Sequence, residues 1–433
     1  ATTGRTPQGE GYLKRAWDLL KHPLVRAHRA GRRLPRDMHR PGDEPAADAT
    51  TNARVWSAHG RSMGEFNPED IRYDAAFAQD MHNELDRIKA EEQQLKDSEL
   101  MHLLQELIPD TDQEREEDLS DADSECQGLA EAIKAKLDKE HEQRQPDTTS
   151  AMNRLITEAE LREALERTPN YRATGDDGIK GEFLRYLGDE AIAALLELYN
   201  FVFNHQKCPE SWSKDIAWPI YKKGSRKNPS NYRLITLMSV MAKVFERIMH
   251  SRLTAWCQTA AADGPPTISP NQVGFQADRC TMDHLYTLVE TVRMRQTARR
   301  PTYACFVDCK KAFPSVFKTG LLVKMHQIGV RGRYWRMVTA MYERISTRVL
   351  TGHDNEIHTA DVESLYYQID TGVREGSILS PLLYILFIDG MLRELRKSGY
   401  GVRLHNLATS QRTWVGALMY ADDLALLARS PGE

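Results

Sequence analysis

The sequence predicts an α+β fold for most of this chain, and three observations support the prediction. Strand-like runs and segments with helical spacing of apolar residues follow one another in an irregular order, unlike the regular alternation of a doubly wound parallel sheet. Two apolar runs flank a short polar stretch near residue 421, as in a hairpin. The composition, with 41% hydrophobic and 28% charged residues, is that of a protein with a real core.

The composition divides the 433 residues into three parts. Residues 1–70 are rich in Arg, Gly, Pro, Ala and Thr, and we expect a flexible basic arm there. Residues 71–148 are acidic and rich in helix-forming residues, so we expect a helical region. Residues 149–433 have the helix and strand patterns that are typical of a globular domain. Two interpretations of the arm remain open: a solvated, disordered segment or a segment that contacts nucleic acid.

Several classes of protein are disfavoured by the sequence. No window approaches the roughly 18–20 apolar residues of a membrane helix, and the best candidate, 378–392, is interrupted by Pro381 and Asp389. The first residues lack the apolar core of a secretory signal. The six cysteines are scattered without a CxxC pair, which favours reduced thiols. We therefore expect an intracellular protein without a membrane partner, located in the nucleus, the cytoplasm or both.

The acidic region is predicted to contain one long helix followed by a charged loop. Ala75–Leu107 has helix formers throughout, and its apolar residues recur near helical spacing at Met81, Leu85, Ile88, Leu95 and Leu100. The block Asp110–Glu125 carries like charges and is predicted to be a solvated loop. Its charge offsets basic charge elsewhere, so the net charge of −4 does not argue against a local basic groove.

The globular part is predicted to begin with helices that lead into a strand and a basic turn. Thr157 followed by Glu160 is a capping-box pattern, which marks a helix start. Residues 191–203 have helical spacing, residues 216–221 are strand-like, and a basic turn at 222–227 follows them. The apolar residues of 237–253 recur at helical spacing, which predicts an amphipathic helix there.

The segment Tyr303–Asp308 is predicted to be a strand that ends in a carboxylate. Because side chains alternate along a strand, Phe306 and Asp308 share one face, and Cys305, Val307 and Cys309 share the other. We interpret the two cysteines as small core residues rather than metal ligands. Taken alone, Asp308 is also compatible with a helix or turn cap.

The stretch LMYADDLALLA, Leu418–Ala428, places two adjacent carboxylates inside an apolar sequence. Its flanking runs predict a hairpin with Asp422 and Asp423 at the bend. Charges flanked by buried strands require positive partners. If the strand ending at Asp308 lies beside this hairpin, three carboxylates meet at one end of a sheet. Carboxylate oxygens are the ligands that Mg²⁺ prefers, so we expect a site for a pair of magnesium ions, with Mn²⁺ as a substitute.

Six motifs follow one another over more than half of the chain. They are Ala173–Ile179; Trp212–Lys223 with Asn231–Ile235; Pro270–Gln276 with Cys280, Thr281 and Asp283; Phe306–Phe313; Gly372–Leu383; and Tyr420–Asp423. With these motifs, the chain from about Arg154 to Ala428 resembles the reverse transcriptases of non-LTR (LINE-type) retrotransposons. The resemblance implies a right-hand polymerase with fingers and palm, in which helices cover one face of an antiparallel palm sheet.

The resemblance also implies roles for individual residues. Asp308, Asp422 and Asp423 would be the catalytic metal ligands, with Asp423 as the weaker one. Phe313 falls where the family keeps a ring beneath the incoming sugar, which would exclude a 2′-hydroxyl by shape. The nucleotide triphosphate would be received by the backbone near Lys311 and Ala312 and by the side chains of Lys222 or Lys223 and Arg233.

The motif Gly372–Leu383 would bind template and nucleotide. Gly376 allows a close approach to the backbone, and Pro381 starts a helix over 382–395. Glu375 stands where the family usually has Gln, which replaces a donor and acceptor by an acceptor. Pro314 replaces the usual Asp, and Gln276 and Ala277 replace the usual Arg-Pro.

The implied substrates are an RNA template, a DNA primer or target and deoxynucleoside triphosphates. The chain stops just past the hairpin, so the family's primer grip and thumb are missing, and we expect little or no polymerase activity from this polypeptide alone. Two alternatives remain open. One is a degenerate, non-catalytic retroelement remnant that binds nucleic acid. The other is a bacterial-type enzyme such as a group II intron maturase.

Overall fold

The computed structural model describes residues 49–64, 75–107, 148–260, 267–351, 362, 365–405 and 412–432. The chain divides into two compact units. The smaller unit consists of residues 1–63, 216–236 and 346–368, and the larger unit consists of residues 64–215, 237–345 and 369–433. Among the described helices, none is both long and apolar enough to cross a membrane. The mixture of helices and sheets confirms the α+β prediction.

The smaller unit is a sheet with one helix packed on it. Its strands are β1 (Lys214–Tyr221), β2 (Tyr232–Leu237), β4 (Ser346–Val349) and β5 (Tyr367–Gln368), in the order β2-β1-β4-β5. The helix α3 (Ala49–Gly64) buries Trp56, whose ring meets Tyr232 edge-on at 5.1 Å. The Ser57 hydroxyl donates to the Leu365 carbonyl. Residues 49–64 of the expected flexible arm are therefore helical, because Trp56 supplies an apolar anchor; residues 1–48 and 65–70 lie outside the described residues.

The predicted basic turn joins β1 to β2 and is built from local hydrogen bonds. The Lys222 amide donates to the Asn231 carbonyl, and the Asn231 side chain donates to the Ser225 carbonyl. Gly224 has φ +91°, a conformation that favours glycine. The guanidinium of Arg226 lies 5.0 Å from the centre of the Tyr221 ring. Aromatic and backbone contacts thus hold a turn whose lysines are exposed to solvent.

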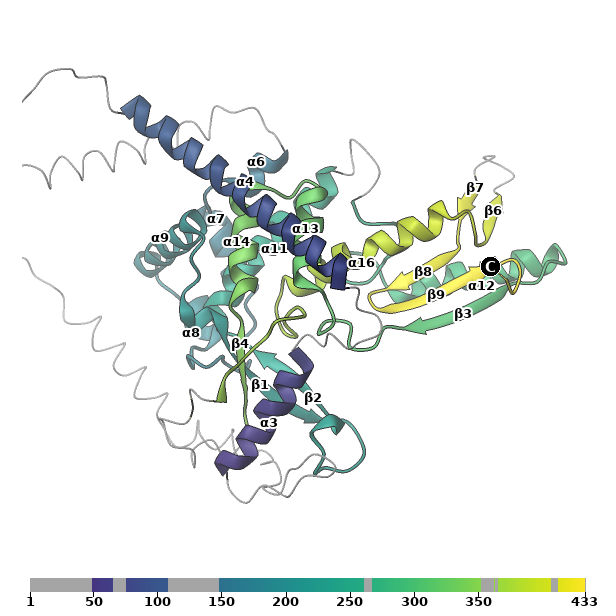
Figure 1. Cartoon of the computed structure of the whole chain (residues 1–433), viewed down its shortest axis with the longest axis horizontal. Helices are drawn as coiled ribbons and strands as arrows, with labels where there is room; N and C mark the ends of the chain where they lie inside the picture. The colour runs from purple at the N-terminus through teal and green to yellow at the C-terminus, as the bar shows by residue number, and fades with distance from the viewer. Residues whose placement is uncertain are drawn as a thin grey trace, which may run out of the picture. The chain divides into compact units, whose positions relative to one another are not determined.

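The larger unit contains the main hydrophobic core and most of the helices (Figure 1). Its helices are α4 (Ala75–Leu107), α6 (Thr148–Asn153), α7 (Glu158–Glu166), α8 (Gly181–Arg185), α9 (Asp189–His205), α10 (Glu210–Ser213), α11 (Val240–Ala260), α12 (Thr281–Thr297), α13 (Lys318–Gln327), α14 (Gly332–Glu343) and α16 (Ser380–Lys397). The capping box at Thr157 and Glu160 is confirmed, and so are the helices predicted at 75–107, 191–203, 237–253 and 382–395.

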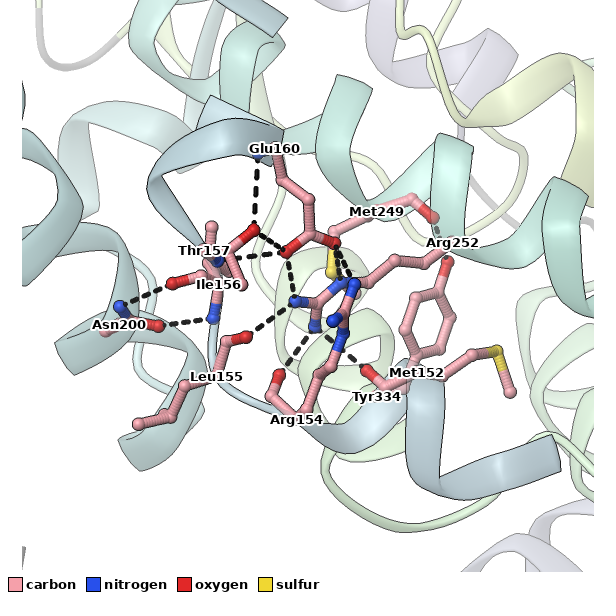
Figure 2. A network of polar contacts seen from close by, with 10 residues as sticks. All are labelled: Met152, Arg154, Leu155, Ile156, Thr157, Glu160, Asn200, Met249, Arg252 and Tyr334. Atoms are coloured by element: carbon pink, nitrogen blue, oxygen red, sulfur yellow. Dashed lines mark hydrogen bonds and ion pairs between the residues drawn. The ribbon is translucent and has the colours of Figure 1, made fainter. Parts of the chain in front are cut away.

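One buried arginine ties three parts of this core together (Figure 2). Arg252 of α11 donates to both carboxylate oxygens of Glu160 at 2.8 and 2.9 Å. It also donates to the carbonyls of Met152 in the last turn of α6 and of Arg154 and Leu155 in the segment between α6 and α7. The peptide carbonyls of this turn therefore find donors inside the protein, and the start of α7 is fixed against α11.

The long helix α4 packs along α13 and α14 of the larger unit (Figure 1). Its buried stripe includes Leu85 and Ile88, as the periodicity predicts, but Leu95 is exposed. Glu92 is buried in that stripe instead. Its carboxylate pairs with Arg336 at 2.7 Å and with His326 at 3.3 Å, and accepts the Gly332 amide. Leu100 and the acidic block Asp110–Glu125 lie outside the residues whose side chains are described.

A second sheet of the larger unit carries the carboxylates. Its strands are β3 (Tyr303–Asp308), β8 (Ala417–Tyr420) and β9 (Asp423–Ala428), in the antiparallel order β3-β9-β8. One face packs on α16 through a cluster with Leu392, Met419 and Leu424. The other face lies toward α12. A small ribbon of β6 (Arg403–His405) and β7 (Arg412–Trp414) stands beside it.

The position of β3 overturns one prediction. Cys305 was expected to be a small core residue, but its side chain is exposed, and Cys309 is only half-buried. The reason is that β3 is an edge strand of its sheet, and all of its residues are exposed. Alternation along a strand identifies which residues share a face, but it does not say whether another element covers that face.

Candidate active site

The sheet register brings Asp308 and Asp423 together. They are direct partners across β3 and β9, and Asp423 is also the partner of Tyr420 across the hairpin. Because directly paired residues of neighbouring strands point to the same face, these three residues share one face with Phe306. The predicted hairpin is therefore confirmed, with Ala421 and Asp422 as its two-residue bend.

Asp422 is next to this pair at the bend, and its backbone carbonyl accepts the Cys309 amide at 3.4 Å. Burial raises the pKa of the Cys309 thiol, and the charges of Asp422, Asp308 and Asp423 raise it further. All three carboxylates thus lie near enough to the Cys309 thiol, just beyond the end of β3, to raise its pKa. The end of this strand lies beside the hairpin bend, as the sequence analysis expected.

The surroundings of these carboxylates bear on whether a cation fits. Within the described ranges, no Lys or Arg forms an ion pair with any of the three. Hard divalent cations prefer such oxygen donors. The side chains are not closed into a ligand set, however: in the described part of the chain, no group of three or more His, Cys, Asp or Glu residues is arranged to hold a metal ion. The chemistry of the donors fits a divalent ion, and the ligand geometry is not preformed.

Backbone packing from a distant segment supports the bend. The carbonyl of Asn271 accepts the Met419 amide at 2.8 Å, and the Met419 carbonyl accepts the Val273 amide at 3.0 Å. A Cβ atom on Gly274 would lie 2.3 Å from the Ala421 nitrogen, so only glycine fits there. Sequence analysis assigned no role to this segment; its only signal was that Pro270–Gln276 matched a family motif.

The residues after β3 form a half-buried loop, in which Phe313 packs against two other aromatic rings. The Phe313 ring lies 5.3 Å from Tyr384 of α16 and 6.2 Å from the exposed Phe275. Ala312 is half-buried beside the core, and Lys311 is exposed with φ +54°. The Phe313 carbonyl accepts the Val373 amide at 2.9 Å, which joins this loop to the segment Gly372–Leu383.

Buried charged residues that sequence analysis missed form ion pairs and hydrogen bonds with the segment Gly372–Leu383. Arg374 pairs with Asp215 at 3.4 Å, and Glu246 accepts the Ser377 hydroxyl and the Ile378 amide at 2.8 and 2.9 Å. Burial raises the pKa of Asp215 to about 7, although Arg374 opposes the change. In the same segment, Glu375 is half-buried, and Gly376 is exposed with φ +122°. No sequence signal links residues separated by 131 positions.

The remaining predicted residues belong to the other unit. Lys222 and Lys223 are exposed in the turn after β1, and Arg233 is exposed on β2. All three lie in the smaller unit, whereas the aspartates lie in the larger one.

A cavity of about 290 Å³ opens on the face that carries Asp308 and Asp423. It lies between α12 and the three-stranded sheet, and its walls include His284, Leu288, Phe306 and Leu418. The cavity is therefore largely apolar, and two carboxylates lie at its edge.

Comparison with known proteins agrees with this geometry. Residues 220–433 match the family described as reverse transcriptase (RNA-dependent DNA polymerase). The "Probable RNA-directed DNA polymerase from transposon X-element" of Drosophila melanogaster is 30% identical over 234 residues, which are 54% of this chain and 24% of that protein. The RNA-directed DNA polymerase from mobile element jockey of the same species is 26% identical over 64% of this chain and 28% of its own length. The Pol polyprotein from the type-1 retrotransposable element R2 of Nasonia vitripennis is 25% identical over 62% of this chain and 23% of its own length.

Residues 220–433, which include the carboxylate hairpin, thus match a reverse transcriptase domain. The relatives from the X-element, jockey and R2 indicate that this domain is similar to the reverse transcriptases of non-LTR, LINE-type retrotransposons. The chain spans about a quarter of the length of these relatives.

Proposed function

We propose that this chain contains the catalytic core of an RNA-directed DNA polymerase, which copies an RNA template by adding deoxynucleotides to a primer 3′-hydroxyl. The observation that carries the proposal is the direct pairing of Asp308 with Asp423, with Asp422 at the adjoining bend. The three neighbouring acidic side chains have no Lys or Arg partner in the described ranges, so their charges repel one another, and a bound cation would neutralise them.

The proposed roles follow from side-chain chemistry. Asp308, Asp422 and Asp423 would hold Mg²⁺, or Mn²⁺ in its place. Two bound ions would supply charge stabilisation for an in-line phosphoryl transfer. Phe313 would lie under the nucleotide sugar and select against a 2′-hydroxyl. The triphosphate would contact the backbone at Lys311 and Ala312, and Glu375 and Gly376 would border the nucleotide.

The charge of the smaller unit supports a polyanionic partner. Its described residues include eight Lys or Arg and no Asp or Glu, although the whole chain has a net charge of −4. These cations are Arg54, Arg61, Lys222, Lys223, Arg226, Lys227, Arg233 and Arg348. A group of cations attracts phosphate backbones, which supports an RNA template, a DNA primer or target and nucleoside triphosphates as partners.

The test is extension of a labelled DNA primer on an RNA template, with Mg²⁺ or Mn²⁺ varied. Asp308→Asn and Asp422→Asn should each lower incorporation by about 100- to 1,000-fold, the scale for losing one electrostatic stabiliser of a transition state. Asp86→Asn, at an exposed position of α4, is the matched control and should leave incorporation unchanged. Measurable incorporation that is equal in Asp308→Asn and the wild type would refute the proposal.

A second candidate is a retroelement remnant that binds nucleic acid without catalysis. It is favoured by the open arrangement of the carboxylates and by the cations among the described residues of the smaller unit. This candidate predicts that the wild type binds an RNA–DNA duplex and incorporates no nucleotide with either metal. It also predicts that Asp308→Asn leaves duplex affinity unchanged.

A further inference from the structure

The bend that carries Asp422 is in an unfavourable backbone conformation. Ala421 has φ +56°, in the left-handed region that residues with a side chain rarely adopt. Such a conformation persists only when surrounding contacts hold it in place. The same bend sets the directions of Asp422 and of Asp423, which begins β9.

The contacts that hold the bend come mainly from one buried side chain, Gln272, which is fully inaccessible to solvent. Its Oε1 accepts the Ala421 amide at 2.9 Å and the Gly274 amide at 2.8 Å. Its Nε2 donates to the Ala421 carbonyl at 3.2 Å. One amide side chain therefore binds both polar groups of the residue that has the left-handed conformation.

Only an amide of this length satisfies these contacts. The site requires an acceptor and a donor at the end of one side chain, and a carboxylate offers acceptors alone. Methionine has a similar length and cannot replace either hydrogen bond. The backbone on both sides of Gln272 is anchored as well: the Asn271 carbonyl oxygen lies 3.0 Å from His284 Nε2, and the Val273 amide donates to the Met419 carbonyl at 3.0 Å. The backbone of Gln272 is thus anchored, while its side chain forms hydrogen bonds with the bend at Ala421.

We propose that Gln272 is a positioning residue for the reaction: it holds Ala421 in the left-handed conformation and thereby orients the Asp422 and Asp423 carboxylates. This inference rests on the proposed function for its catalytic consequence. Gln272 touches neither the carboxylates nor a substrate, so its effect passes through the backbone of the bend.

The decisive variant is Gln272→Met, which keeps the approximate size and removes all three hydrogen bonds. Hydrogen–deuterium exchange of peptides covering 417–424 measures the bend directly and needs no activity. Exchange of the Ala421 amide should accelerate by about tenfold or more, because a buried donor loses its acceptor. Unchanged exchange in this peptide would overturn the proposal. If Gln272→Met does not fold, Gln272→Asn is used, whose shorter side chain does not reach the bend.

Gln206→Met is the matched control. Gln206 also has a left-handed backbone, with φ +52°, and its side chain also donates to backbone carbonyls, of Phe203 and Asn204 at the end of α9. The control removes the same kind of contact at a place remote from the carboxylates in sequence. It should leave both the exchange of 417–424 and nucleotide incorporation at wild-type values.

Steady-state kinetics then separates positioning from a general loss of structure. Gln272→Met should lower kcat and raise the half-saturating Mg²⁺ concentration by about 10- to 100-fold, the usual effect of losing an outer support of a metal ligand. The KM for the nucleotide should stay near its wild-type value. A higher KM for the nucleotide, with kcat and the half-saturating Mg²⁺ concentration unchanged, would refute the positioning role.

A second-site substitution provides the rescue. Because glycine adopts positive φ without a steric penalty, Ala421→Gly should restore a large part of the kcat lost in Gln272→Met. No rescue, with the double variant folded, would contradict the inference. If the wild type shows no incorporation while exchange of 417–424 still responds to Gln272→Met, the proposed function fails and the bend support stands.

Discussion

At the scale of single residues, Glu160 shows how one contact sets a pKa. Burial raises the pKa of this carboxyl, but its hydrogen bonds and ion pair with Arg252 outweigh burial and bring the pKa to about 2. The contact joins α7 to α11 in the core of the larger unit. The sequence revealed Glu160 as a capping residue; it could not reveal that an arginine 92 positions away would share it.

The pH dependence of stability follows from this lowered pKa. Because the folded-state value lies below the ordinary 4.5, the contribution is present above pH 4.5 and is lost as pH falls toward 2. Replacing Glu160 by Gln should therefore reduce the free energy of unfolding at pH 7 by about 3 kcal/mol. The difference between wild type and variant should shrink below about pH 4. Urea denaturation at several pH values measures both effects.

Glu163→Gln is the control on the same helix. Glu163 pairs with Arg167 at 2.7 Å, but both side chains are largely exposed, and such pairs contribute about 0–1 kcal/mol. The account of Glu160 is wrong if the difference between Glu160→Gln and wild type is the same at pH 3 as at pH 7.

At the scale of elements, the long helix α4 and the hairpin β8–β9 were predictable because their signals are local. The bounds predicted for α4, Ala75–Leu107, agree with the structure, since helix propensity and periodicity act over neighbouring residues. The partner of α4 was not predictable. Its buried Glu92 faces Arg336 and His326, so a helix that reads as part of a separate acidic region packs within the larger unit.

This packing makes α4 important for stability. Glu92→Leu should lower the free energy of unfolding of the larger unit by about 3–5 kcal/mol, because it leaves Arg336 buried without its carboxylate. Chemical denaturation followed by tryptophan fluorescence, to which the buried Trp335 near His326 contributes, measures the change. Glu91→Leu, at the neighbouring exposed position, should change stability by less than about 0.5 kcal/mol. Equal effects of the two substitutions would mean that α4 does not depend on this contact.

At the scale of the whole molecule, the described residues of the smaller unit concentrate positive charge. The overall charge of −4 conceals a smaller unit whose described residues carry cations only. An average over the chain could not show this, because the unit is assembled from three separate stretches of sequence.

This concentration of positive charge predicts how nucleic-acid affinity depends on salt. The double variant Lys222→Ala with Lys223→Ala should weaken binding to an RNA–DNA duplex about equally for all sequences. It should reduce the slope of log affinity against log salt by up to about 2, one counterion for each lost phosphate contact. Filter binding or fluorescence anisotropy at several salt concentrations measures the slope.

Arg162→Ala is the matched control, because Arg162 is exposed and already paired with Glu158 and Asp189. It should leave the slope unchanged. A slope that is identical in the wild type and the double variant would place nucleic-acid binding elsewhere than on this turn.

The sequence by itself determined the elements and their chemistry. Local propensity specified α4, α7, β3 and the hairpin, and the ordered motifs indicated similarity to reverse transcriptases of the non-LTR type. Only the tertiary structure decided which residues meet: the pairing of Asp308 with Asp423, the exposure of Cys305, and the grip of Gln272 on Ala421. The physical reason is range, since propensity acts between neighbours, whereas register and burial depend on segments that lie more than a hundred residues apart.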